Sequence, residues 1–456
     1  MLEKHPYIPN DSSVLSEMLQ AIGISNLSEM FLDVPISNFG SEGLQRQPLD
    51  EYSMVGQMKS LLSRNKNYGN RSFIGGGPWT HFVPGVIRHI ISRGEFLTAY
   101  TPYQPEISQG LLQSLFEFQS LICELYGMGV ANASMYDLPT AIGEAALLCA
   151  RVTGRQTFLV PSSIPWEKKS VLRNYIEPQG MAVREVPYDA QSGNMDLARL
   201  REAVDEGVSG VYLETPSFFG TIEPDLTSVA DVAHHAGSLF VVGADPISMG
   251  SFRAPGEGGA DIAVGDGQPL GIPPGFGGNG LGLMACVDEP KLVRQLPGRI
   301  VGLTKTKDGT RDGFVLALST REQHIRRGRA TSNICTNESL LAIAATVYLA
   351  LLGQEGLTKL SRVILNRTAY AVERLQALGL AVRFSGMHFR DFVVEVSDPG
   401  GVNSDLRRLG FSGGRELGTD FQELDRGLLF ATTEIHTYDD IDNFAEALQK
   451  AAGGRK

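Results

Sequence analysis

Residues 210–243 read "GVYLETPSFFGTIEPDLTSVADVAHHAGSLFVVG" and form a strand–helix–strand pattern. Residues 210–215 and 239–243 are apolar and rich in strand-forming side chains. Residues 225–237 begin with an aspartate cap, repeat apolar side chains at helical spacing and end on a glycine. This alternation predicts parallel or mostly parallel strands with helices packed against the sheet.

The same alternation continues on both sides of this unit. We expect an α/β protein with a large, mostly parallel sheet that is covered by helices on both faces. Further strands are expected at 157–160, 181–186, 261–265 and 281–287, and further helices at 111–127 and 196–207.

Outside this region the sequence predicts two other parts. Residues 1–70 are expected to form a helical arm, because "DSSVLSEMLQAIG" has an Asp/Ser start and a glycine stop. We also expect this arm to contact a second chain. Residues 71–335 hold the large domain. Residues 336–456 are expected to form a bridging helix and a smaller C-terminal domain. The apolar run at 340–352 is too short to span a bilayer, so we expect a buried helix there.

Composition excludes several classes of function. The 456 residues carry 40 basic and 51 acidic side chains, and a net charge of −11 disfavours nucleic-acid or anionic-membrane partners. The four cysteines lie far apart without a C-x-x-C pair, which argues against a structural metal site and a disulfide scaffold. The first ten residues lack the pattern of an export signal, so a cytoplasmic location is expected.

A glycine-rich stretch, "DGQPLGIPPGFGGNGLG", occupies residues 266–282. It contains one G-x-G-x-x-G, at Gly275, Gly277 and Gly280. A dinucleotide fingerprint must follow a strand and open a helix, whereas this one precedes an expected strand. No lysine follows these glycines, so a P-loop is excluded as well.

A missing lysine is more informative. An enzyme of this architecture that uses pyridoxal phosphate (PLP) needs a lysine just after a late strand, to form an imine with the cofactor. The expected place is "DIAVGDGQPLG" (261–271), where Gln268 stands. Glutamine is a neutral amide and cannot form an imine. Lys168 and Lys169 are the nearest lysines along the chain, but they precede the expected strand by far.

Two polar segments are candidates for binding. "TAYTPYQPEISQG" (98–110) could line a ligand cleft or be a surface turn that docks a neighbouring subunit. "REQHIRRGR" (321–329) places Arg321, His324, Arg326 and Arg327 together in an acidic protein. Such a cluster could receive an anionic ligand or partner, or pair with the chain's own carboxylates.

Several long motifs together resemble subunit 1 of the two-subunit P-protein family of the glycine cleavage system. This family is also called glycine dehydrogenase (decarboxylating, aminomethyl-transferring) or glycine decarboxylase. The resemblance runs from about residue 5 to residue 450. The motifs are "EFLTAYTPYQPEISQG", "PGEGGADIAVGDGQPLG", "PGRIVG", "REQHIRR" and "ATSNICTNESLLAIAATVYLALLG".

The resemblance implies the fold of fold-type I PLP enzymes and a division of labour. Subunit 2 would carry PLP and its lysine, whereas this chain would bind no cofactor and complete the dimer. The pair would decarboxylate glycine and pass the aminomethyl group to the lipoyl arm of H-protein, within a heterotetramer of two copies of each subunit. In that setting Tyr100, Thr101, Tyr103 and Gln104 are candidates for lining the partner's cleft, and the arginine segment for contacting H-protein or an anion.

The chain departs from the family pattern where a cofactor pocket would lie. Leu138 replaces a glycine after "ASMYD", and Pro165 replaces a histidine. Val242 or Gly243 stands where PLP-binding chains carry an aspartate. Two alternatives remain open: a self-sufficient PLP-dependent aminotransferase or lyase that uses another lysine, and a non-catalytic scaffold of the same fold.

Overall fold

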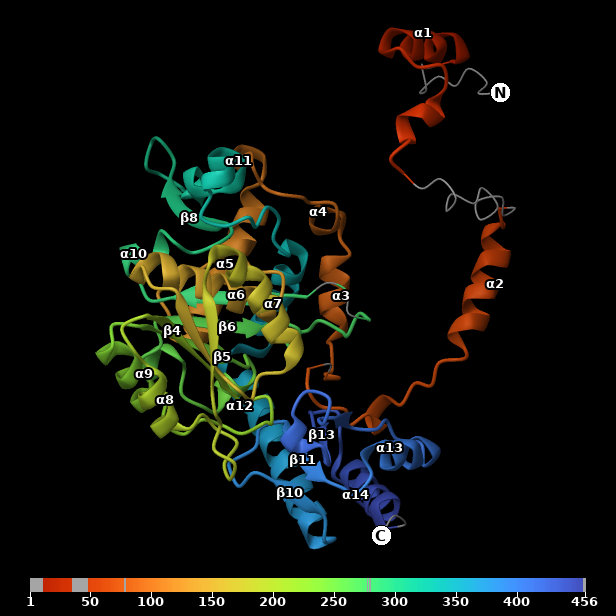
Figure 1. The fold of residues 1–456 in the computed structure, drawn as a ribbon, viewed down its shortest axis with the longest axis vertical. Helices are drawn as coiled ribbons and strands as arrows, with labels where there is room; N and C mark the ends of the chain where they lie inside the picture. The colour runs from red at the N-terminus through yellow and green to blue at the C-terminus, as the bar shows by residue number, and fades with distance from the viewer. Residues whose placement is uncertain (1–10, 35–47, 78, 277, 279, 454–456) are drawn as a thin grey trace. The chain divides into compact units, whose positions relative to one another are not determined.

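Five parallel strands form the centre of the larger part of the protein. In this computed structural model, which describes residues 11–34, 48–77, 79–276, 278 and 280–453, they belong to a seven-stranded sheet of order β1-β7-β6-β5-β4-β2-β3 (Figure 1). Strands β2 to β6 run parallel, whereas β7 is antiparallel to both β6 and β1. The strands are β1 (Val130–Ala131), β2 (Thr157–Pro161), β3 (Ala182–Val186), β4 (Val208–Thr215), β5 (Leu239–Ala244), β6 (Ile262–Asp266) and β7 (Gly282–Cys286).

Helices cover this sheet on both faces, as predicted. Along β4, Val211 and Leu213 belong to one buried cluster and Tyr212 to the other, because successive side chains of a strand point to opposite faces. One face packs against α6 (Leu138–Thr153) and α7 (Trp166–Ile176). The other packs mainly against α5 (Gln109–Tyr126), α8 (Leu197–Ala203), α9 (Leu226–His235) and the first part of α12 (Ser339–Ala377).

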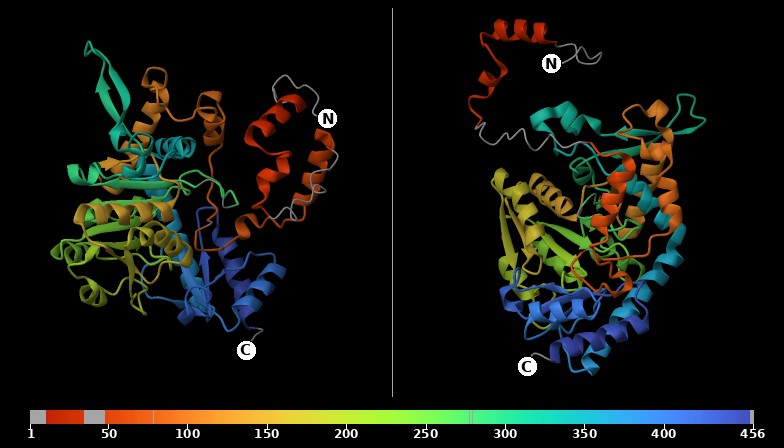
Figure 2. Two further views of the ribbon diagram at one scale, coloured as in Figure 1. Left: turned by 45° about the horizontal axis from the view of Figure 1, so that its top comes forward. Right: turned by 90° about the vertical axis from the view of Figure 1, so that its right-hand side faces the viewer.

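A second, antiparallel sheet follows α12. Its order is β10-β11-β13-β12, and α13, α14 and the end of α12 pack against it around Phe392, Phe430 and Phe444. Both views in Figure 2 show α12 running from the large sheet to this smaller one. The elements are β10 (Ala381–Arg383), β11 (Asp391–Glu395), α13 (Pro399–Arg408), β12 (Arg415–Glu416), β13 (Gly427–Ala431) and α14 (Tyr438–Gly453).

The remaining elements lie between the arm and α12 in the chain. A two-stranded hairpin of β8 (Ile300–Lys305) and β9 (Asp312–Ala317) precedes the short helix α11 (Gln323–Arg326). The other short helices are α3 (Gly85–Ile91), α4 (Gly94–Leu97) and α10 (Pro290–Val293).

Two predicted helix boundaries were wrong. The helix expected over 196–207 ends at Ala203, because the Asp205 carboxylate accepts the backbone N–H of Gly207 and forms a turn before the glycine is reached. The buried helix expected within 340–352 extends over 39 residues to Ala377, with a break at Gly353 (φ 57°, ψ −175°).

By length and composition α12 could cross a membrane, unlike the short run considered from the sequence. Its N-terminal half contributes Ala342, Ala345 and Tyr348 to the core beneath the sheet, which identifies it as a core helix.

The N-terminal arm is a separate unit, Met1–Asn67, and Tyr68–Lys456 form the other. Helix α1 (Ser12–Ile22) begins at the carboxylate cap of Asp11 and ends at Gly23 in the left-handed region, as the sequence predicted. Helix α2 spans Glu51–Leu62. Neither helix buries a single residue, so the described residues of these two helices form no core by themselves. The predicted boundary between residues 335 and 336 stays a prediction.

Candidate functional site

Three carboxylates mark the edge of the sheet where neighbouring parallel strands end. Glu214 lies near the end of β4, Asp245 directly follows β5, and Asp266 ends β6. All three line a cavity of about 200 Å³. In open α/β sheets, ligands bind outside the carboxyl ends of the strands, so this cavity is the candidate site.

Arg390 enters the cavity wall from the turn before β11. Its side chain is fully buried, and its backbone is held in the left-handed region (φ 69°). Nη1 donates to Asp245 Oδ2 at 2.6 Å, and the guanidinium lies over the Trp79 ring at 4.2 Å from the centroid. Among the described residues, neither Nε nor Nη2 of Arg390 meets a hydrogen-bond acceptor. The cavity therefore contains a buried cation whose hydrogen-bonding capacity is only partly used.

Asp266 and a further carboxyl group of the wall, Asp391, form no ion pair among the described residues. Burial raises the pKa of Asp266 to about 6, against a backbone N–H donated by Gln268. Burial likewise raises the pKa of Asp391 to about 6, although nearby Arg390 and the donors Gly76 N–H and Trp79 Nε1–H oppose the shift. Both groups are thus partly protonated near pH 6.

The cavity also contains an amino group. Lys168, from the first turns of α7, donates from Nζ to Glu214 Oε1 at 2.8 Å, and Tyr212 donates its hydroxyl to the same oxygen. Lys168 is one of the two lysines, with Lys169, that the sequence left open as rival imine formers, and it lies at the candidate site.

Gln268 lies just beyond β6, but its side chain turns back on its own loop. Nε2 donates to the Ile272 carbonyl at 2.6 Å, and Oε1 is buried without a partner among the described residues. Gln268 does not contribute to the described cavity wall. The side chain at the expected lysine position therefore stabilises its own loop.

The three departures from the family pattern lie at or near the cavity. Leu138 lines it from the first position of α6, and Gly243 lines it from β5. Val242 is buried in the core beneath β5. Pro165 is buried at the start of α7, one turn before Lys168.

The glycine-rich loop allows close backbone contact beside this site. A Cβ on Gly280 would lie 2.8 Å from the Tyr136 carbonyl, and one on Gly282 would lie 2.5 Å from the Asp137 carbonyl. Gly275 has open space, and Gly277 lies outside the described residues. The strand expected after the loop is β7, which agrees with the rejection of a dinucleotide motif.

The two polar segments singled out in the sequence meet each other away from this cavity. Tyr103 packs edge-on against His324 with ring centroids 5.6 Å apart, and its hydroxyl accepts from Arg299 Nη2 at 2.9 Å. Tyr100 OH lies 3.1 Å from Thr336 Oγ1. Thr101 is half-buried and Gln104 is exposed.

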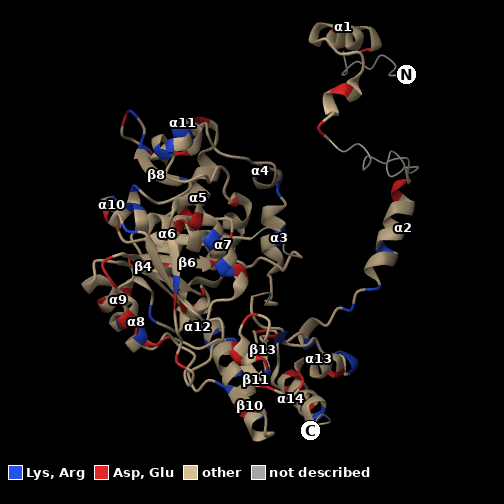
Figure 3. Cartoon of the chain, viewed as in Figure 1, with Lys and Arg blue, Asp and Glu red and all other residues tan. Residues whose placement is uncertain are grey.

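The arginines of the second segment divide into two kinds. Arg321 is partly buried and donates from Nη1 to the Gly298 carbonyl at 2.8 Å. Arg326 and Arg327 are exposed around α11, where Figure 3 colours much of the ribbon blue for lysine and arginine. His324 Nδ1 lies 3.6 Å from a Glu322 carboxylate oxygen. Within this segment, His324 therefore lies beside the carboxylate of Glu322, whereas Arg326 and Arg327 are exposed to solvent.

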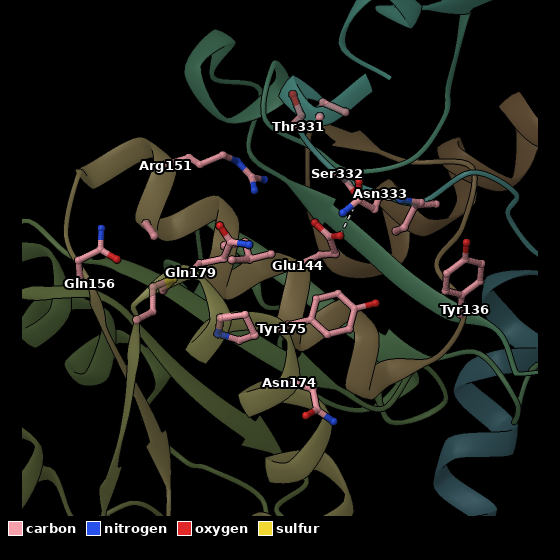
Figure 4. Close-up of a pocket in the computed structure, with 17 residues that line it drawn as sticks. Tyr136, Glu144, Arg151, Gln156, Asn174, Tyr175, Gln179, Thr331, Ser332 and Asn333 are labelled. Atoms are coloured by element: carbon pink, nitrogen blue, oxygen red, sulfur yellow. Dashed lines mark hydrogen bonds between the residues drawn. The ribbon is translucent and has the colours of Figure 1, made fainter. Parts of the chain in front are cut away.

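A wider, open groove of about 640 Å³ lies between α6, α7 and residues 328–334 (Figure 4). At its centre Ser332 donates to Glu144 Oε1 at 2.6 Å, while burial raises the pKa of Glu144. Arg151 is fixed at one side by hydrogen bonds to Gln295. The groove shares Gly328 with the arginine segment, so the two surfaces are continuous.

Sequence reasoning missed Asp245, Asp266, Arg390 and Asp391 as site residues. A usable signal existed for the first two, because three successive parallel strands each have an acid at or next to their carboxyl end. Arg390 and Asp391 had no such local signal.

The large sheet, the smaller C-terminal sheet and the cavity at the strand ends define the fold of fold-type I PLP-dependent enzymes. A sphingosine-1-phosphate lyase of Burkholderia pseudomallei has the same fold, with a TM-score of 0.64 at 17% identity over 92% of this chain and 93% of that chain.

The particular family follows from closer matches. A family model described as "Glycine cleavage system P-protein" matches residues 5–448, and this chain belongs to that family. A chain of a crystal structure titled glycine decarboxylase (P-protein) of the glycine cleavage system, in inhibitor-bound form, is 40% identical, with a TM-score of 0.84 over 98% of this chain and 99% of that chain.

Curated relatives of nearly equal length agree with this assignment. A protein of Thermococcus kodakarensis named "Probable glycine dehydrogenase (decarboxylating) subunit 1" is 48% identical, with 99% of each chain covered. A protein of Staphylothermus marinus with the same name is 45% identical, with 98% of each chain covered.

Proposed function

We propose that this chain is the subunit of a two-chain glycine decarboxylase that holds no PLP. One observation carries the proposal: Gln268, with its amide bonded to the Ile272 carbonyl, occupies the position after β6 where an imine-forming lysine is expected. The relatives named subunit 1 support a division between two chains. The partner would supply PLP, and the pair would decarboxylate glycine and transfer the aminomethyl group to H-protein.

The cavity fits PLP poorly. Imine chemistry needs a free amino group, whereas the amino group in the wall, Lys168 Nζ, is paired with Glu214 at 2.8 Å. A cofactor phosphate would meet a wall with more carboxylates than cations, since Asp266 and Asp391 have no ion pair of their own among the described residues. A dianion is repelled by such a surface. No catalytic step is therefore assigned to PLP in this chain.

The arm supports the need for a partner chain. Helices α1 and α2 bury none of their residues, and Met18, Ile22, Met58 and Leu62 are each at least half exposed. Helices of this kind gain most of their stability in proteins from packing an apolar face. We assign that packing to the lysine-bearing subunit, in a heterotetramer of two copies of each chain in the cytoplasm.

The contact between Tyr103 and His324 supports a shared role for the two polar segments. We assign Tyr100, Thr101, Tyr103 and Gln104 to the lining of the partner's cleft. Arg321, His324, Arg326 and Arg327 are assigned to contact with H-protein or an anionic group. The exposed Arg326 and Arg327 have the charge needed to attract an acidic partner at long range.

Mixing experiments test the assignment. Purified chain alone should catalyse no glycine-dependent exchange of CO2, and activity should appear when the lysine-bearing homologue is added. A matched control is the same chain without residues 1–67, which should keep its folded larger unit but restore less activity at equal concentration. Exchange by the chain alone would contradict the proposal.

The position of Lys168 favours one second candidate function, that of a self-sufficient PLP enzyme. Its Nζ lies in the cavity wall, where the ion pair with Glu214 is the one that it forms among the described residues. Trapping a PLP imine with borohydride and mapping the labelled peptide distinguishes the two, because a label on Lys168 supports the second candidate.

A further inference from the structure

The open groove between α6, α7 and residues 328–334 is separate from the cavity at the strand ends. Gln156 directly precedes β2 and Met181 directly precedes β3, so this part of the groove lies at the amino ends of parallel strands, opposite the ends that carry the cavity. The described walls of the groove and of the cavity have no residue in common. The proposed subunit role assigns nothing to this groove.

Arg151, near the end of α6, is a cation of the groove wall that is held in place without a counter-ion. Its Nε donates to the side-chain oxygen of Gln295 at 2.9 Å, and its Nη2 donates to the carbonyl of the same residue at 3.2 Å. Figure 4 shows the Arg151 guanidinium pointing toward the middle of the groove. Arg151 is exposed, and it forms no ion pair among the described residues. A guanidinium that is oriented in advance loses little rotamer freedom when it binds an anion.

The charges around Arg151 favour an anion as its ligand. Burial lowers the pKa of Arg321 behind the wall, Glu322 opposes this shift, and the nearby Arg151 lowers the pKa of Arg321 further. The described wall has one acid, Glu144, which is buried and accepts from Ser332. Burial raises the pKa of Glu144, against the hydrogen bond from Ser332 and the charge of Arg151. A negative ligand would reduce the repulsion between the two arginines, and the raised pKa of Glu144 makes its carboxyl easier to neutralise.

Neutral polar side chains line the rest of the groove. Asn174 lies near the end of α7, Gln179 ends the turn that follows this helix, and Asn333 belongs to the segment on the other side. Tyr136 and Tyr175 add hydroxyl groups (Figure 4). Within the part of the chain that the structure describes, none of these five side chains makes a hydrogen bond. Amide groups both donate and accept hydrogen bonds, so they are suited to hydroxyl groups, which do the same.

We propose that this groove binds a small hydroxylated organic anion, a sugar acid or a sugar phosphate, with the anionic group on Arg151 and the hydroxyl groups on the amides of Asn174, Gln179 and Asn333. A guanidinium edge fits a carboxylate as well as a phosphate. A neutral sugar would leave the charge of Arg151 unused, and an inorganic anion would leave the amides unused. The groove volume of about 640 Å³ lies within the 300–1,000 Å³ typical of small-molecule sites.

Calorimetric titration of the full-length chain tests the proposal. The probes are D-gluconate and D-glucose 6-phosphate, which distinguish a carboxylate from a phosphate, with D-glucose and inorganic phosphate as analogues that each lack one feature. At least one of the two hydroxylated anions should bind at millimolar concentration or below, and both analogues at least tenfold more weakly. The absence of heat with both hydroxylated anions, or equal affinity for inorganic phosphate, would overturn the proposal. Tighter binding of a tetraglutamate peptide would show that the groove receives an acidic polypeptide and would overturn it as well.

Variants place the ligand in the groove. Arg151→Gln should weaken binding of the better hydroxylated anion at least tenfold, whereas Arg173→Gln, an exposed position of α7 outside the described wall, should leave it unchanged. An undiminished affinity in a folded Arg151→Gln variant would overturn the proposal. If Arg151→Gln fails to fold, Ala150→Trp narrows the groove from α6 and should abolish binding. Binding that survives Ala150→Trp would overturn the proposal too.

Hydrogen exchange supplies an independent readout on the unmodified chain. The bound anion should slow amide exchange in residues 174–181 and 328–334, which form or adjoin the groove wall. Protection confined to residues 243–246 and 389–391 would show that the ligand binds in the strand-end cavity and would overturn the assignment. The chain is measured alone, so the result is separable from the mixing experiment.

Discussion

Replacing Asp266 with asparagine should stabilise the protein at neutral pH and do little in acid. Burial raises the pKa of this carboxyl from 3.8 to about 6. A group whose pKa is higher in the folded state favours folding below its unfolded pKa, and that advantage is lost as the pH rises through the folded pKa. Above pH 6 the folded protein therefore holds an unfavourable buried charge, which asparagine removes while its side-chain oxygen still accepts the Gln268 N–H.

The size of the expected stabilisation follows from the pKa shift of Asp266. At about 1.36 kcal/mol per pKa unit, the gain in the free energy of unfolding is about 3 kcal/mol at pH 7.5 and about 1 kcal/mol at pH 4.5. The larger unit has about 390 residues and an unfolding entropy of about 0.8 kcal/mol/K. The melting temperature should therefore rise by about 4 °C at pH 7.5 and by about 1 °C at pH 4.5.

Thermal melts followed by circular dichroism at both pH values measure this difference. Asp391→Asn should show the same sign, since burial also raises the pKa of Asp391 to about 6. Asp189→Asn is the matched control, because hydrogen bonds from Ser192 lower the pKa of Asp189, and its loss should not stabilise the protein at pH 7.5. An Asp266→Asn variant that melts at or below the wild-type temperature at pH 7.5 would refute the reasoning.

Three further predictions concern the core and the proposed contacts. Phe444→Ala removes a ring whose centroid lies 4.1 Å from the centroid of the stacked Phe73 ring in the C-terminal core. It should lower the free energy of unfolding, measured by chemical denaturation, by about 3–5 kcal/mol. A loss below about 1 kcal/mol would contradict that packing. Tyr103→Phe combined with Thr101→Val should lower turnover of the reconstituted enzyme while sedimentation shows intact assembly, and unchanged turnover would remove the cleft role. The KM for H-protein should rise with salt concentration, and Arg327→Ala should make this rise smaller. An unaltered salt dependence of the KM would exclude the contact.

The elements of the fold were predictable where their signals are local. The strands at 157–161, 208–215 and 239–244 are apolar runs bounded by turns, and α1 has its aspartate cap and its glycine within one short segment. The end of α8 was mispredicted because a turn made by Asp205 competes with a glycine stop. The length of α12 was missed because its second half packs on the C-terminal sheet, which the apolar run at 340–352 does not indicate.

The candidate site, too, could be predicted only where its signal is local in the sequence. Gln268 could be interpreted from the sequence because a single residue type after one strand decides whether an imine can form. The pair of Arg390 and Asp245 joins positions 145 residues apart, and no periodicity links them. The contact between Tyr103 and His324 was missed for the same reason, although each segment was singled out separately.

The most direct test of the central claim is PLP uptake by the purified chain alone, followed by borohydride reduction and a peptide map for pyridoxyl-lysine. The position of Gln268 after β6 and the ion pair of Lys168 with Glu214 predict no labelled lysine. The lysine-bearing homologue, treated in the same way, should be labelled. A stoichiometric pyridoxyl label on this chain, on Lys168 or any other lysine, would show that it holds its own cofactor and would contradict the account.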